Sequence, residues 1–254
     1  MSIRILISND DGINSEGLYA LYEALKDLGE VFVVAPDRDQ SASSHALTLH
    51  RPLRIEEISK NIYSVDGTPT DCINLAVNGL LKDRKPNLVV SGINKGENLG
   101  DDITYSGTVS AAMEGTLLGI PSIAVSLSGR DNFHFETASY YAIILARYVL
   151  EKSLPLGTLL NVNVPNLLKE KVKGIKVTRQ GKRLYGEPIV ENIDPRGRKY
   201  YWIGGNELGF LDIENSDITA VKQGYVSVTP IKLDLTDYDF LNKLKLDLKK
   251  LENA

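Results

Sequence analysis

Short apolar runs of the kind buried on both faces alternate with amphipathic helical patterns through about the first 165 residues. The apolar runs predict strands at 3–8, 31–35, 88–91, 120–126 and 158–164. Apolar spacing between these strands predicts helices at 15–25, 68–82, 108–118 and 135–152. Ser15 and Thr68 are suited to cap the first two helices, and Pro69 suits a first helical position. Repeated βα units predict an α/β fold with a doubly wound, mostly parallel sheet.

The pattern changes after about Pro165, where strand-like pieces are separated by turn-rich segments. The pieces lie at 175–178, 199–203 and 225–229, and 194–197 suits the tip of a hairpin. A final helix is predicted from 236 to about 251, with leucines along one face that must dock on something. We therefore divide the chain into a core, 1–165, and a C-terminal extension with a hairpin and a helix, 166–254.

The predicted hairpin carries three consecutive aromatic residues, Tyr200, Tyr201 and Trp202. Aromatic side chains are favoured in the cores of subunit interfaces, which makes the extension a candidate oligomerisation element. The alternative is that these rings cover the parent sheet, and the sequence does not decide between the two.

Composition limits the classes of function. The 254 residues, 43% of them hydrophobic, suffice for one large domain or one domain with an appendage. No apolar run approaches the roughly 20 residues that cross a bilayer, so we expect no membrane partner and a cytoplasmic location. The net charge of -4 provides no basic surface for a nucleic-acid duplex. Cys72 lies in an apolar helical stretch and is interpreted as core packing.

Two adjacent carboxylates, Asp10 and Asp11, follow directly after the first predicted strand. In open α/β sheets, ligands bind outside the carboxyl ends of the strands. Two neighbouring anions repel each other, and a nearby cation relieves the repulsion. Asn9 and Gly12 flank the pair, and these residue types also form ordinary turns. Taken alone, the pair is equally consistent with a turn and with a metal site.

Polar segments also follow the next two predicted strands. The loop 36–48 is longer than a minimal connection and offers the hydroxyls of Ser41, Ser43 and Ser44. After the strand at 88–91, glycines permit close approach of a ligand and Asn94 offers a neutral oxygen. Each segment alone is more typical of a surface turn.

The helix predicted at 108–118 is preceded by small residues, and this changes the interpretation of the loops. Unpaired N–H groups at a helix N-terminus, together with the hydroxyls of Ser106 and Thr108, are suited to bind a phosphate. Two carboxylates, a serine hydroxyl and an asparagine oxygen form a hard-oxygen set that suits one Mg²⁺ or Mn²⁺. We leave out His45 and His50, because lone histidines are more often structural and His50 falls in a strand predicted at 46–50.

Six short segments of the chain carry a resemblance to a known family. They are 8–12 (SNDDG), 35–37 (APD) with Ser41 and 44–45 (SH), 67–69 (GTP), 90–94 (VSGIN), 105–108 (YSGT) and 224–230 (GYVSVTP). In this order, and over nearly the whole chain, the sequence resembles the SurE family of metal-dependent nucleotidases. One departure is Ala42, where many members carry glycine; the methyl group should tighten the loop without removing a ligand.

The resemblance implies a Rossmann-like catalytic core, a C-terminal part that exchanges elements between protomers, and a homodimer or homotetramer. It implies hydrolysis of nucleoside 5′-monophosphates to nucleoside and phosphate. Its metal ligands fall on Asp10, Asp11, Ser41 and Asn94. Its substrate-binding residues fall on Asn98, Ser106, Gly107 and Thr108. Asp10 and Asp11 are the catalytic candidates, and either can serve as general base.

Two other classes of function fit the sequence less well. A phosphoacceptor signalling module would need an acceptor aspartate at the end of the third strand, where the chain has Ser91 to Asn94. A dinucleotide-dependent oxidoreductase would need Gly-x-Gly-x-x-Gly after the first strand, where only Gly12 and Gly17 occur. The sequence leaves open the base preference, the physiological metal, and activity on 3′-nucleotides or short polyphosphate.

Overall fold

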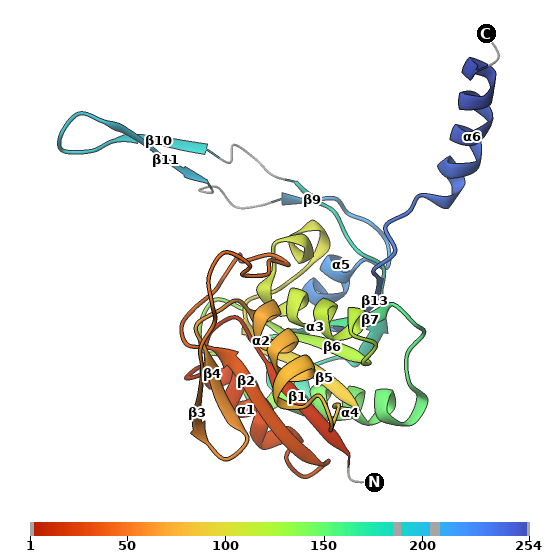
Figure 1. Ribbon diagram of the computed structural model, residues 1–254. Coiled ribbons are helices and arrows are strands. Elements are labelled where there is room, and N and C mark those ends of the chain that lie inside the picture. Colours follow the sequence, from red (N-terminus) through yellow and green to blue (C-terminus); the bar gives the residue numbers. More distant parts are fainter. Residues whose placement is uncertain (1–2, 185–188, 204–208, 253–254) are drawn as a thin grey trace.

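The computed structural model describes residues 3–184, 189–203 and 209–252. A nine-stranded sheet lies at the centre, in the order β3-β4-β2-β1-β5-β6-β7-β13-β8 (Figure 1). The strands of this sheet are β1 (Arg4–Ser8), β2 (Glu30–Pro36), β3 (Ile55–Ser59), β4 (Ile62–Val65), β5 (Leu88–Lys95), β6 (Ser122–Ser128), β7 (Thr158–Pro165), β8 (Ile175–Val177) and β13 (Val226–Lys232). The six strands from β4 to β7 are parallel, whereas β3 and β13 run antiparallel to their inner neighbours. The predicted α/β fold with a mostly parallel, Rossmann-like sheet is confirmed.

Helices cover both faces of the sheet. Their bounds are α1 (Glu16–Leu25), α2 (Pro69–Leu75), α3 (Gly107–Leu117), α4 (Phe135–Lys152), α5 (Asp217–Lys222) and α6 (Tyr238–Glu252), with short helical turns η1 (Ala76–Leu80), η2 (Gly100–Thr104) and η3 (Lys169–Lys171). Ser15 and Thr68 cap α1 and α2 as predicted, and Asp71 completes a capping box at α2. The helix predicted at 68–82 changes into the π-helical turn η1 after Leu75, so its α-helical part is shorter than expected.

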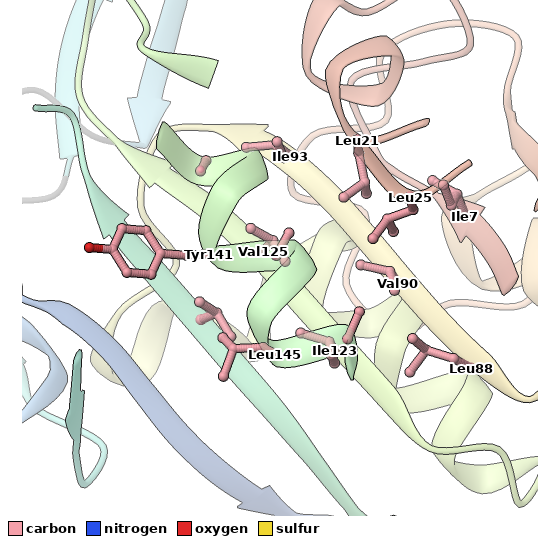
Figure 2. Packing of buried hydrophobic residues seen from close by; sticks show 14 of the residues in the cluster. Ile7, Leu21, Leu25, Leu88, Val90, Ile93, Ile123, Val125, Tyr141 and Leu145 are labelled. Carbon is pink, nitrogen blue, oxygen red and sulfur yellow. The ribbon is translucent and has the colours of Figure 1, made fainter. Parts of the chain in front are cut away.

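Alternate residues of the central strands pack into two apolar layers. Ile5 and Ile7 of β1 pack with α1 and α4, whereas Leu6 packs with α2 and α3 on the opposite face. Figure 2 shows the first layer, in which Leu21 of α1 and Tyr141 of α4 lie over the parallel strands. Side chains alternate between the faces of a strand, so a strand covered on both faces must be apolar throughout.

Cys72 of α2 is fully buried within the second layer. Burial raises the pKa of its thiol well above the ordinary value. The interpretation of Cys72 as a packing residue is therefore confirmed.

The strand predicted at 46–50 is absent, because its backbone bonds to the start of α2 instead of to a neighbouring strand. The N–H of Thr48 donates to Asp71 Oδ1 at 2.8 Å, and the Thr68 hydroxyl donates to the carbonyl of Ala46 at 2.7 Å. The prediction also missed β3 and β4, which form a hairpin at the sheet edge around Asn61. Every residue of β3 is exposed, so it lacks the apolar signal of a buried strand.

Two parts of the chain after residue 165 extend away from the sheet (Figure 1). One is the hairpin of β10 (Ile189–Ile193) and β11 (Lys199–Ile203), and the other is α6. Tyr200, Tyr201 and Trp202 are 43%, 56% and 65% exposed, so the alternative that they cover the parent sheet is wrong. The short strands β9 (Arg183–Leu184) and β12 (Gly209–Phe210) pair at the base of the hairpin.

The remaining strands of this region belong to the central sheet. β13 pairs with β7 and β8 pairs with β13, while α5 packs against β13 and β7. Within the described ranges, none of the helices combines the length and apolar composition needed to cross a membrane.

Close packing of α1 on β5 leads to a test of the fold. A Cβ atom at Gly17 would lie 2.0 Å from the carbonyl oxygen of Ile93, which is fixed by the sheet. We expect Gly17→Ala to lower the free energy of unfolding by about 2–3 kcal/mol, because backbone must move to admit the methyl group. Urea denaturation measures this change.

The matched control is Gly79→Ala, where a Cβ atom would meet nothing within 4 Å. We expect that substitution to leave stability unchanged or to raise it by up to about 1 kcal/mol. Equal effects of the two substitutions would contradict the packing of α1 described above.

Candidate functional site

The acidic pair, Asp10 and Asp11, lies at the topological switch point of the sheet, between β1 and β5. From β1 the chain builds outward through β2 and β4, then returns to β5 on the other side of β1. A crevice forms at such a switch point, outside the carboxyl ends of the two diverging strands. Asp10 and Asp11 follow β1, and Asn94 lies near the end of β5, so both sets border this crevice.

Asp10 is almost completely buried, with 5% of its surface exposed. The Thr108 hydroxyl donates to Asp10 Oδ1, and the Thr108 N–H also bonds to the carboxylate. Burial is the main cause that raises the pKa of Asp10 to about 6, and the negative charge of Asp11 adds to it. The Thr108 bonds oppose this rise without cancelling it. The structure thus joins the acidic pair directly to the start of α3.

Asp11 is more accessible and faces the neighbouring strand. Its Oδ2 accepts a hydrogen bond from the N–H of Lys95 at 3.4 Å. Burial raises the pKa of Asp11, the charge of Asp39 raises it further, and Lys95 opposes both. The pKa values of Asp10 and Asp11 are therefore both raised, and the nearby Lys95 does not fully offset their negative charge.

Asn94 is positioned by an irregularity in β5. The pairing register between β5 and β6 shifts between Ser91 and Asn94, and Gly92 within the shift has φ +133°, which favours glycine. The Asn94 side-chain N–H donates to the carbonyl of Gly96 at 3.0 Å. Because that bond uses the amide nitrogen, the amide oxygen is the atom available to a cation.

Ser41 belongs to the loop after β2, which reaches the acidic pair through its backbone. The N–H of Gln40 donates to the Asp10 carbonyl at 2.8 Å, and the N–H of Ser41 donates to Asp39 Oδ1 at 2.7 Å. Ser41 itself is exposed. Ser41 is therefore adjacent in sequence to Gln40, which bonds to Asp10. Asn94 is likewise adjacent to Lys95, which bonds to Asp11.

The same loop brings Ser43 to the site, a position that sequence reasoning named only as one of three hydroxyls. Its Oγ is buried and has no hydrogen-bond partner in the structure. A Cβ atom on Gly107 would lie 2.9 Å from this Oγ and 2.9 Å from Asp10 Oδ2. Residue 107 must therefore be small for the loop, the acidic pair and α3 to meet.

The start of α3 contacts Asp10, as predicted. The Ser106 hydroxyl, however, is used within the helix. It accepts from the N–H of Val109 at 3.0 Å and so caps the helix. Asn98 is also engaged within the protein: its side-chain N–H donates to Ser126 Oγ at 2.8 Å, and its main-chain N–H donates to Asn163 Oδ1 at 2.8 Å. Direct contact of Ser106 and Asn98 with a substrate stays a prediction.

The residues present are suited to a divalent cation. Asp10, Asp11, Ser41 and Asn94 offer only oxygen donors, which hard cations prefer. Two neighbouring carboxylates whose pKa values are both raised have the electrostatics that a cation would relieve. In the described residues, no cluster of three or more His, Cys, Asp or Glu side chains is placed to hold a metal. The predicted set contains only two such residues and depends on the hydroxyl and the amide for the remainder.

His45 lies outside this oxygen set. Its Nε2 is 2.9 Å from Glu114 Oε2 of α3, and Asn74 of α2 donates to the other carboxylate oxygen at 2.7 Å. These contacts fasten the loop after β2 to two helices. The exclusion of His45 from the metal ligands stays a prediction.

Burial of Asp10 predicts that the metal-free protein becomes more stable as the pH falls from 7 to 5. Its pKa in the folded protein is about 6, above the value of about 3.9 in an unfolded chain. Between these values the folded protein binds more protons, so the free energy of unfolding falls as the pH rises. The whole shift corresponds to about 3 kcal/mol, of which about half falls between pH 5 and pH 7.

Urea denaturation of EDTA-treated protein at pH 5 and pH 7 tests this dependence. Asp10→Asn should be more stable than wild type at pH 7 and should lose this part of the pH dependence, because the amide does not titrate. The same difference between pH 5 and pH 7 in both proteins would contradict the buried titration of Asp10.

The chain is similar in sequence to known proteins over most of its length. The family model described as survival protein SurE matches residues 5–187. A protein named 5′-nucleotidase SurE from Geotalea daltonii is 58% identical over 244 residues, covering 96% of this chain and 98% of that protein. The protein of the same name from Myxococcus xanthus is 57% identical over 242 residues, covering 95% and 92%.

A solved structure agrees with these sequence relatives. The crystal structure of SurE protein from Aquifex aeolicus matches with a TM-score of 0.87 and 52% sequence identity, covering 96% of this chain and 98% of that one. Sequence and fold agree over almost the whole length, and this chain belongs to the SurE family.

Proposed function

We propose that this protein is a 5′-nucleotidase that hydrolyses nucleoside 5′-monophosphates with the help of one divalent metal ion. The observation that carries the proposal is the contact between the buried Asp10 and Thr108 at the start of α3, at the switch point of the sheet. Relatives more than half identical to this chain bear the name 5′-nucleotidase, which supports nucleotide phosphomonoesterase activity. Mg²⁺ and Mn²⁺ are the candidate ions, held by Asp10, Asp11, Ser41 and Asn94.

The chain's own residues have three tasks in this proposal. Thr108 holds Asp10 through Oδ1, so that Oδ2 is directed to the space beside Gly107. The absence of a side chain at Gly107 lets Asp10 and Ser43 pack against the start of α3, where N–H groups favour an anion such as the phosphate group. Asp10 or Asp11 accepts a proton from the attacking water. When bound, the cation polarises the phosphoryl group and lowers the pKa of water beside it.

Catalysis in this scheme is mainly electrostatic. Phosphoryl transfer spreads negative charge over the equatorial oxygens of the phosphate, and fixed donors and a cation stabilise that charge. The protein therefore needs no covalent intermediate. The accumulation of acidic charge at Asp10 and Asp11 is useful only when the cation is present to balance it.

Release of inorganic phosphate from AMP and GMP tests the activity and its metal dependence. We expect turnover with Mn²⁺ or Mg²⁺, loss of turnover after EDTA, and recovery when metal is restored. Asp10→Asn should lower kcat/KM by on the order of 100-fold or more, because one cation ligand is lost. The exposed Asp27→Asn is the matched control and should retain wild-type activity.

Two outcomes separate the parts of the proposal. No turnover of any phosphomonoester with added metal would contradict the nucleotidase function. Turnover that is indifferent to EDTA and to Asp10→Asn would contradict the metal mechanism alone. The same assay with 3′-AMP and tripolyphosphate defines how far the substrate range extends beyond 5′-nucleotides.

We also propose that the protein is a homodimer or homotetramer joined through the β10–β11 hairpin and α6. Trp202 and Ile203 of the hairpin are 65% and 86% exposed, and Leu248 and Leu251 of α6 are 49% and 72% exposed. Contiguous apolar residues of this kind mark protein contacts more often than solvated surface. A second copy of the chain is the occupant that the resemblance implies.

Light scattering after gel filtration measures the molar mass. We expect the mass of two or four chains for the wild-type protein. Leu248→Glu should reduce the mass or weaken the assembly, because it places a charge in the apolar face of α6. Asn242→Glu adds the same charge to the helix and is the control. A monomeric wild-type protein would contradict the proposed assembly.

A further inference from the structure

A second buried carboxylate, Asp217, lies outside the acidic pair. It is the first residue of α5 and only 1% exposed. Its Oδ2 accepts a hydrogen bond from the N–H of Gly100 at 2.9 Å, and its Oδ1 accepts from Gly181 at 2.8 Å and Ile218 at 2.7 Å. One side chain thus joins α5 to two loops that are distant in the sequence.

Gly100 lies in the loop between β5 and α3, two residues after Asn98. The main-chain carbonyl of Asn98 accepts hydrogen bonds from the side chains of Asn161 at 2.8 Å and Asn163 at 2.9 Å, both on β7. The loop is therefore held on one side of Leu99 by the sheet and on the other side by Asp217. Both anchors are buried hydrogen bonds.

The segment 180–183 holds the same loop from outside. Gln180 donates to the carbonyl of Gly100 at 3.0 Å. Arg183, whose side chain is 11% exposed, donates to Asp102 at 2.7 Å and to Glu97 at 3.3 Å. We call these contacts of Gln180, Arg183 and Asp217 with residues 97–102 the loop clamp.

The clamped loop continues directly into the site. It passes through η2 to Tyr105, whose carbonyl accepts from the N–H of Ser44, and to Ser106, which caps α3. Two residues later Thr108 donates to Asp10. A displacement of Gly100 would therefore move Asn98 on one side and the start of α3 on the other.

The burial of a carboxylate here is costly, which indicates that its contacts serve more than packing. Burial raises the pKa of Asp217, and the three N–H donors oppose that rise. An apolar residue would fill a buried position at lower cost. The backbone is also shaped around the carboxylate, since a Cβ at Gly181 would lie 2.7 Å from Asp217 Oδ1 and Gly100 has φ +55°.

We propose that Asp217 is a positioning residue of the nucleotidase site, which holds Gly100 and through the loop clamp sets the loop 97–104 and the start of α3 against the phosphate group of the substrate. The inference rests on the proposed function. It assigns to α5, in the C-terminal part of the chain, a role in substrate binding. Asp217 acts through the backbone of the loop and does not itself touch the substrate.

Asp217→Asn tests this role while keeping the shape of the side chain. The amide oxygen can still accept from Gly181 and Ile218, but the amide nitrogen then faces the N–H of Gly100. We expect KM for AMP and the inhibition constant of inorganic phosphate to rise about tenfold, consistent with loss of one hydrogen bond to a charged group. The value of kcat should stay within about threefold of wild type, because the side chains of Asp10 and Asp11 are not substituted.

The matched control is Asp212→Asn, which makes the same charge change at an exposed position five residues earlier. Arg183→Met is the second variant, and it decides the matter if Asp217→Asn does not fold. It keeps an unbranched side chain but loses the bonds to Glu97 and Asp102, and should raise the same two constants. Circular dichroism at the assay temperature confirms that each variant assayed is folded.

The outcomes are distinguishable. Absence of turnover by wild-type protein overturns the proposed function and this inference together. Wild-type turnover with unchanged KM and inhibition constants in the folded variants overturns this inference alone, even if their Tm values fall, because the role is then only structural. Equal rises in Asp212→Asn would overturn it as well, since they would reflect overall charge.

Discussion

The burial of the Asp10 carboxylate against the start of α3 is the constraint on which the site depends. An anion at this depth is costly, and the structure offsets part of the cost with the hydroxyl and N–H of Thr108. The remaining cost appears as a pKa raised to about 6. In the proposed function, a cation beside Asp10 offsets this charge. The loops after β2 and β5 are arranged around this group, and Gly107 leaves the space that they require.

Much of the fold could be predicted from the sequence because its strongest signals are local. A strand buried on both faces, such as Ile5 to Ile7, cannot be polar at any position, and Thr68-Pro69 marks a helix start within two residues. The edge strand β3 and its neighbour β4 have no such signal, because every residue of β3 is exposed and Ile62 and Tyr63 of β4 are only partly buried. The error at 46–50 has the opposite cause. Its backbone is satisfied by Asp71 and Thr68, a contact that the local pattern does not contain.

The candidate site divides in the same way. Asp10, Asp11 and Asn94 could be found because each follows an apolar strand in a fold whose ligands collect at strand ends. Ser43 could not be distinguished from its two serine neighbours, since their order along the loop does not say which hydroxyl is turned inward. Asp217 could not be found either. Its contact with Gly100 spans 117 positions in the sequence, and a carboxylate after a serine cap resembles any ordinary helix start.

Residues after position 165 have two physically different roles. β8, β13 and α5 complete the sheet and reach back to the loop before α3, so they share the core's packing and its buried hydrogen bonds. The β10–β11 hairpin and α6 instead extend away from the sheet, and in a single chain they expose Trp202, Ile203 and Leu251 to solvent. A side chain that projects apolar surface gains little stability until it meets a partner. Arg183 belongs to both parts. It lies in β9, which pairs with β12 at the base of the hairpin, and its side chain bonds to Asp102 in the loop clamp.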